Sequence, residues 1–233
     1  AHYHPEFMAE ALRLSYCSYI RDPMRCNTVP GQFSEWFDGE SLVNRGMRLS
    51  PWEPPRYLWA AVEGACGLEL PREPGRLPKV DPRPSPRWKW VALRHCIVRG
   101  APLSFFCVRH RRGLRLYVNR NVESPAIKEV YRMDISSAIS GAEEVALMAF
   151  AGRRGRVAVC LGNPLPRAVV VPLDLSGVLD RRGTYSVEVL DTEKDDWVRL
   201  GEVRGEEILS LSVHIEEQGA RVIEMEPLPR SGR

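Results

Sequence analysis

The chain has 233 residues, enough for one large domain or two small ones that each bury a core. Hydrophobic residues make up 44% and charged residues 27% of the sequence, and no stretch approaches the roughly 20 apolar residues that a membrane helix needs. The formal net charge is only +3 and the basic residues are scattered, so we expect neither a membrane nor nucleic acid as a partner.

The cysteines are expected to be small core residues rather than a disulfide framework or a metal site. No two are spaced as Cys-x-x-Cys, and none is grouped with histidines at the spacing of zinc ligands. A lone cysteine inside an apolar segment usually packs as a small hydrophobic residue. We therefore expect a reducing, cytoplasmic compartment and no metal or organic cofactor. The six are Cys17, Cys26, Cys66, Cys96, Cys107 and Cys160.

An amphipathic helix is predicted over residues 5–20. Its apolar residues recur in steps of three and four, and Asp22-Pro23 ends it because the residue before a proline is pushed out of helical geometry. The apolar stripe consists of Phe7, Met8, Ala11, Leu12, Tyr16, Tyr19 and Ile20. The helix starts close to Ala1, with neither an initiator Met nor a signal-peptide pattern, so we expect the sequence to begin part-way through a domain.

A second helix is predicted to open at Pro54-Pro55, because prolines suit the first helical turn, and to stop at Gly67. Its apolar stripe contains Leu58, Val62 and Ala65. Residues 71–87 then hold six prolines, a density that denies the segment a helix or a central strand. That segment is therefore expected to be a semi-rigid linker at a domain boundary.

Short β-rich runs separated by turn signals fill the remainder of the chain. Many short strands at such spacing predict an antiparallel sandwich or barrel. The runs are 88–98, 103–109, 114–118, 127–135, 144–150, 157–161, 168–175, 184–190, 197–203, 208–215 and 221–225. The predicted fold class is therefore α+β, with a helical segment at 1–70, the linker at 71–87 and a β-sandwich domain at 88–233.

The segment between the two helices carries the candidate chemistry. Glu35 and Asp38 stand among the aromatic residues Phe33, Trp36 and Phe37. Aromatic faces stack on the C–H surface of a sugar, and a carboxylate can accept hydroxyl hydrogen bonds or activate water. In the plainer alternative, the aromatic residues fill a gap between helices and the acids are solvated. Composition alone favours that alternative, because short motifs of this kind occur in many loops.

A resemblance to a known family favours the sugar-site hypothesis. The run from Phe33 to Asp38, followed by Ser50-Pro51-Trp52 and the helix at 56–60, resembles the late part of the catalytic barrel in (α/α)6 six-hairpin glycosidases. These include the mannosylglycerate-hydrolase-like, α-glucosidase, trehalase and glycogen-debranching groups. The resemblance covers about residues 1–70 and implies that residues 1–70 are the last helices of such a barrel.

The resemblance also implies roles for individual residues. Glu35 would be the general base of an inverting hydrolysis of O-glycosidic bonds, on an α-linked gluco- or manno-configured carbohydrate. Trp36, Asp38, Glu40, Trp52 and His4 would contact the substrate. The partner general acid in these families lies well upstream of the base, and Asp38 and Glu40 are too near Glu35 in sequence to replace it comfortably. We therefore expect half of an active site here, the rest coming from a missing N-terminal barrel portion in the same gene or in a separate chain.

Other interpretations stay open. The chain could be a non-catalytic carbohydrate-binding or assembly subunit. His2 and His4 could bind a metal, although no third ligand is near in sequence. Trp88 and Trp90 share a face of a predicted strand and could stack on sugar, although packing against protein is the favoured use. His95, His110 and His214 are expected to be ordinary strand or turn residues.

Overall fold

The computed structural model describes residues 4–20, 36–40, 44–45, 53–192 and 196–229. The chain separates into two compact units. One comprises Ala1–Glu69 with Pro82–Pro86, and the other comprises Leu70–Asp81 with Arg87–Arg233. None of the helices within the described ranges is long and apolar enough to cross a membrane.

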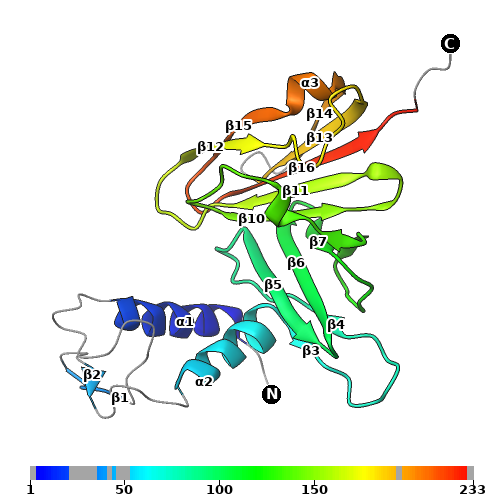
Figure 1. Cartoon of the computed structure of the whole chain (residues 1–233). Helices are drawn as coiled ribbons and strands as arrows, with labels where there is room; N and C mark the ends of the chain where they lie inside the picture. The colour runs from blue at the N-terminus through cyan, green and yellow to red at the C-terminus, as the bar shows by residue number, and fades with distance from the viewer. Residues whose placement is uncertain (1–3, 21–35, 41–43, 46–52, 193–195, 230–233) are drawn as a thin grey trace. The chain divides into compact units, whose positions relative to one another are not determined.

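The N-terminal unit contains the two predicted helical segments (Figure 1). Its elements are α1 (Pro5–Ile20), β1 (Trp36–Phe37), β2 (Asn44–Arg45), α2 (Glu53–Trp59), a π-helical segment (Ala60–Ala65) and β3 (Leu68–Glu69). The helix predicted at 5–20 is confirmed. Its predicted stripe is partly wrong, since Leu12 is buried but Phe7 is 78% exposed.

The second helical segment changes character along its length. It is α-helical through Trp59 and then widens into a π-helix that ends before Gly67, whose φ of +62° allows the chain to turn away. Gly64 lies close against Met8, so a side chain larger than hydrogen at this position would meet the Met8 sulfur. This contact joins the π segment to α1.

The predicted helical-barrel architecture is wrong. Only 16% of the structure is helical and 46% is strand, so the chain is mainly β, and among the described residues no tail of a helical barrel is seen. The helical period on which the prediction rested is confined to α1 and the α2–π segment. Local periodicity correctly gave these helices, but it carried no information about an assembly of many helix pairs.

The C-terminal unit is built from sheets. Its strands are β4 (Lys79–Val80), β5 (Trp90–Val98), β6 (Ala101–His110), β7 (Gly113–Val118), β8 (Ile127–Val130), β9 (Met133–Asp134), β10 (Ala146–Ala151), β11 (Val157–Gly162), β12 (Val169–Asp174), β13 (Thr184–Asp191), β14 (Asp196–Arg204), β15 (Ser210–Ile215) and β16 (Ala220–Pro227), with the short helix α3 (Gly205–Ile208). They form a six-stranded sheet ordered β14-β13-β16-β11-β10-β9, a four-stranded sheet β5-β6-β7-β8 and the pair β12-β15.

The six-stranded sheet is covered on both faces. Along β11, Val159 and Leu161 pack in a core with β12 and β15, whereas Ala158 and Cys160 pack in a second core with the four-stranded sheet. Because side chains alternate across a strand, a strand that is buried at every position must lie between two layers. The unit therefore has three layers of sheet (Figure 1).

The predicted antiparallel sandwich is corrected accordingly. A third layer is present, and β7 pairs with β8 in parallel. Sequence spacing located most strands well but could not show how they pair, because pairing depends on contacts distant in sequence.

The run predicted as one strand at 127–135 divides between two sheets. Val130 ends β8 in the four-stranded sheet, and Met133 begins β9 at the edge of the six-stranded sheet. Between them the Tyr131 amide donates to the Val118 carbonyl of β7, and the Arg132 amide donates to the Ala151 carbonyl of β10. The chain thus changes sheets across one peptide unit, and this change brings β9 close to the bulge of β5 described below.

The proline-rich segment is held to the β5–β6 hairpin. Arg99 and Gly100, both at positive φ, form the two-residue turn between these strands. The Arg99 guanidinium donates to the carbonyls of Pro71, Glu73 and Arg76 at 2.7, 2.9 and 3.0 Å. The division of the chain at 71–87 stays a prediction.

Candidate functional site

The predicted sugar-site loop contains a short hairpin. Trp36 pairs with Arg45 and Phe37 with Asn44, in antiparallel register. Asp38 and Gly39 begin the connection, and the Glu40 amide donates to Asp38 Oδ1 at 3.2 Å. An aspartate that accepts a hydrogen bond from the amide two residues on stabilises a turn. The Asp38 carboxylate thus helps to shape the loop.

The described structure brings three of the predicted site residues into this hairpin. They are Trp36, Asp38, which is partly exposed, and Glu40, which is exposed. His4 is exposed and precedes α1, where its carbonyl accepts the Met8 amide at 3.0 Å. Glu35 and Trp52 lie outside the described residues. The roles assigned to these six residues stay predictions.

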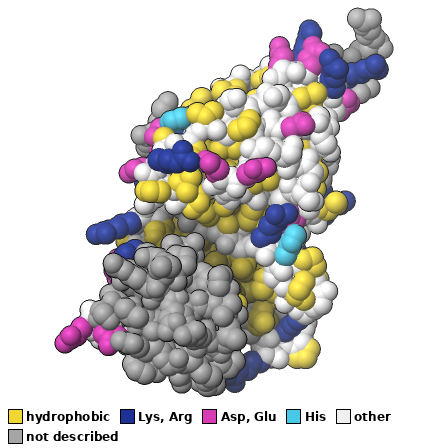
Figure 2. All heavy atoms as spheres, turned by 60° about the vertical axis from the view of Figure 1, so that its left-hand side comes forward, with side chains coloured by type: hydrophobic (Ala, Val, Ile, Leu, Met, Phe, Trp, Pro, Cys, Tyr) yellow, Lys and Arg dark blue, Asp and Glu magenta, His cyan; other side chains and the backbone are white. Residues whose placement is uncertain are grey.

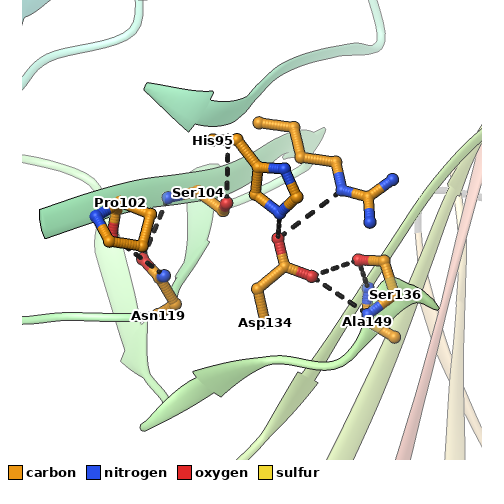
Figure 3. Close-up of polar contacts among 8 residues, drawn as sticks. His95, Pro102, Ser104, Asn119, Asp134, Ser136 and Ala149 are labelled. Carbon is orange, nitrogen blue, oxygen red and sulfur yellow. Dashed lines mark hydrogen bonds and ion pairs between the residues drawn. The ribbon is translucent and has the colours of Figure 1, made fainter. Parts of the chain in front are cut away.

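A second polar cluster, which the sequence did not reveal, lies in the C-terminal unit (Figure 3). The β5–β6 register shifts between Leu93 and Cys96, so that β5 bulges at Arg94 and His95. His95 has a φ of +56°, a left-handed conformation that few residues other than glycine adopt readily. The His95 amide donates to Ser104 Oγ at 3.1 Å.

Asp134 of β9 faces this bulge. Its Oδ2 lies 3.5 Å from His95 Nε2 and 3.7 Å from Arg94 Nε. Its Oδ1 accepts the amide of Ser136 at 3.0 Å and the Ser136 hydroxyl, which in turn accepts the Ala149 amide at 2.9 Å. The Asp134 side chain is only 7% exposed, whereas that of His95 is 61% exposed. The imidazole and guanidinium therefore meet an almost buried carboxylate.

Several opposing causes act on the pKa of Asp134. Burial raises the pKa of this carboxyl, but the hydrogen bonds from Ser136 and Ser104, together with the charge of Arg94, outweigh burial and hold the pKa below its ordinary value. Asp134 is therefore ionised at neutral pH and can pair with a cation.

A charged network joins the four-stranded and six-stranded sheets. Glu224 of β16 accepts the Tyr117 hydroxyl at 2.7 Å and contacts Arg115 at 3.4 Å and Arg156 at 2.5 Å. Glu129 of β8 contacts the same two arginines at 3.6 and 3.2 Å. Burial, together with the Glu224 charge, raises the pKa of Tyr117 well above its usual range, so its hydroxyl stays a donor. This paired network is a structural link between sheets.

The preferred use of Trp90 is confirmed. Its ring stacks on Phe106 with the centroids 5.6 Å apart, and it also lies against Gly162 of β11. Trp90 thus packs between sheets. The interpretation of cysteines as core residues is likewise confirmed for Cys66, Cys107 and Cys160, which are buried, while Cys96 is partly exposed.

The charged side chains were compared over one face of the molecule and for groups that could hold a metal ion. On the face in Figure 2, acidic and basic side chains are interspersed. Within the described ranges, no group of three or more His, Cys, Asp or Glu side chains is placed to hold a metal ion.

Comparisons with known proteins give distant likenesses. No protein-family model and no curated protein matches the chain. Among solved structures, it is similar to a β-L-arabinopyranosidase from Geobacillus stearothermophilus (14% identity, 39% of this chain and 19% of that one, TM-score 0.28). It is also similar to α-galactosidase I from Mortierella vinacea (16% identity, 36% of this chain and 21% of that one, TM-score 0.26). A third similar structure is a xyloglucanase from Paenibacillus polymyxa (13% identity, 36% of this chain and 17% of that one, TM-score 0.27).

The matches span about a fifth of these enzymes. TM-scores below 0.5 do not establish a common fold.

Proposed function

We propose that this chain has a role in carbohydrate processing, as part of a glycosidase that hydrolyses O-glycosidic bonds. The observation that carries the proposal is the Trp36–Phe37/Asn44–Arg45 hairpin, which immediately follows Glu35 and has carboxylates in its connection. A paired backbone holds neighbouring groups more firmly than an unpaired loop does, and catalysis needs such fixed positions.

The specific role proposed for Glu35 is that of general base. It would take a proton from water as the water attacks the anomeric carbon, with inversion of an α-linked gluco- or manno-configured sugar. Inverting hydrolysis requires a second carboxyl, roughly 6.5–9.5 Å from the base, to protonate the leaving oxygen. Asp38 already accepts a local hydrogen bond. We therefore assign the general acid to a part of the enzyme outside this sequence, and Trp36, Asp38, Glu40, Trp52 and His4 to substrate contact.

The test is Glu35→Gln in the complete protein, with hydrolysis of α-linked gluco- and manno-oligosaccharides followed by release of reducing sugar. Loss of a general base is expected to lower kcat by about 10²–10⁴-fold. The matched control is Glu63→Gln, an exposed acid on the π segment, which should retain wild-type activity. The anomer released first, observed by proton NMR, reports inversion.

Activity of Glu35→Gln close to that of wild type would refute the role of Glu35. If the wild-type protein binds these sugars without turnover, the proposal of a glycosidase fails and a non-catalytic carbohydrate-binding subunit is the better description.

A further inference from the structure

β14 is the longer of the two edge strands of the six-stranded sheet (Figure 1). It has nine residues and pairs with β13 along one side, and no described strand pairs with its other side, whereas β9 at the opposite edge has two residues. Most side chains of β14 are exposed, including the apolar Val198 (44%) and Leu200 (57%). An uncovered edge presents backbone N–H and C=O groups, so another strand can extend the sheet there.

A bulge divides β14 into two arms. Arg199 lies opposite Glu188 of β13. The next pair joins Gly201 with Val187, so Leu200 is the extra residue of the bulge. Gly201 has a φ of +89°, in the region that favours glycine. A bulge ordinarily protects an edge, because a regular strand cannot keep its pairing on both sides of the extra residue. A strand with an interruption at the same place can pair with both arms.

The two arms of β14 complement each other. Arg199 in the first arm and Glu202 in the second pair with β13 residues that are two positions apart, so their side chains share one face of the sheet. Val198 and Val203 pair with β13 residues four positions apart and share the opposite face. Two antiparallel copies of β14, with both bulges on a two-fold axis, would set Arg199 of one copy opposite Glu202 of the other. The same arrangement would set Val198 opposite Val203.

We propose that the outer edge of β14 is a homodimer interface, in which β14 of one copy pairs antiparallel with β14 of a second copy. Opposite charges and apolar side chains that face each other across strands stabilise a sheet, whereas like charges destabilise it. Each contact occurs twice because the interface is symmetric. A register shifted by two residues would place Arg199 opposite Arg204, so the charges also select the register. The bulge that disfavours a regular strand thus matches a second copy of this chain.

The oligomeric state of the full chain tests the proposal, measured by sedimentation velocity over a range of concentrations. We expect the wild type to form a dimer that dissociates on dilution. Arg199→Glu brings acidic side chains opposite each other, and Glu202→Arg brings basic ones together, so each variant alone should dimerise at least about tenfold more weakly. An equimolar mixture of the two variants has opposite charges at both positions and should form the dimer again.

A cysteine probe tests the same contact without changing these charges. Leu200 is exposed and would lie beside the two-fold axis, so Leu200→Cys should form a disulfide with its copy under mild oxidation. Val170→Cys, at an exposed position on β12, is the matched control and should form no such cross-link. Arg182→Glu makes the same charge change as Arg199→Glu at an exposed position outside β14, and it should leave the dimer unchanged.

Three results would overturn the proposal. The first is a wild-type chain that stays monomeric at every concentration. The second is a dimer that neither Arg199→Glu weakens nor Leu200→Cys cross-links, because such a dimer uses another surface. The third is a mixture of Arg199→Glu and Glu202→Arg that stays monomeric although circular dichroism shows both variants to be folded.

Discussion

Replacing Glu224 by Gln removes the charge at the centre of the network between the two large sheets. The Glu224 side chain is 12% exposed and contacts Arg115, Arg156 and Tyr117. Breaking a buried ion pair by removing one partner typically costs about 3–5 kcal/mol. Here the cost should be lower, because Glu129 still contacts both arginines and the amide oxygen of Gln can accept the Tyr117 hydroxyl. We expect a loss of about 2 kcal/mol.

Thermal unfolding followed by circular dichroism measures this loss. For a domain of this size, about 2 kcal/mol corresponds to a decrease in Tm of roughly 4–8 °C. Glu226→Gln is the matched control, since Glu226 lies on the same strand and is exposed, and it should change stability by less than about 0.5 kcal/mol. If Glu224→Gln and Glu226→Gln have the same Tm as the wild type, Glu224 does not stabilise the contact between the sheets.

Three further changes test other parts of the fold. Gly162→Ala should destabilise the protein by about 1–3 kcal/mol in denaturant unfolding, because its Cβ would meet the ring of Trp90; an unchanged midpoint would contradict this packing. Arg99→Ala should make limited proteolysis within 70–77 several-fold faster with little change in the amides of β11, because three carbonyls lose their donor; an unchanged cleavage rate would argue against that restraint. Asp134→Asn should lower Tm at pH 6, and the difference from wild type should narrow towards pH 3. A carboxyl whose pKa is lowered on folding stabilises the protein above its pKa in the unfolded chain, about 4, and this stabilisation is lost as the pH falls through its pKa in the folded protein. A Tm difference between Asp134→Asn and wild type that is the same at every pH would refute this role of Asp134.

The sequence was sufficient to predict the positions of most of the individual helices and strands. α1 has the bounds that its apolar period and Asp22-Pro23 predicted, and most predicted strands lie within a few residues of their observed positions. These features are local, since turn residues, prolines and alternation act over a few positions. The exception at 127–135 arises because the chain leaves one sheet and enters another at Tyr131, a change that continuous β-forming residues do not reveal.

The arrangement of the sheets and the polar cluster around Asp134 were harder to predict from the sequence. The fully apolar run 157–161 was compatible with one buried face or two, and only the strands packed on either side of β11 distinguish these cases. His95 and Asp134 belong to separate strands and share no motif spacing, so their pairing could not be read from the sequence. The carboxylates around Glu35 could be identified as candidates from their aromatic neighbours, whereas their relation to a substrate stays a proposal.

The strand order of the six-stranded sheet has a consequence for how the chain folds as it is synthesised. β10 and β11 form one hairpin and β13 and β14 another, and β16 lies between β11 and β13. Because a ribosome delivers the chain from its N-terminus at about 5–20 residues per second, both hairpins emerge before the strand that joins them. Their facing edges, along β11 and β13, would remain open to wrong partners for several seconds. We therefore expect a nascent chain halted before Ala220 to depend on chaperones much more strongly than one released after Pro227.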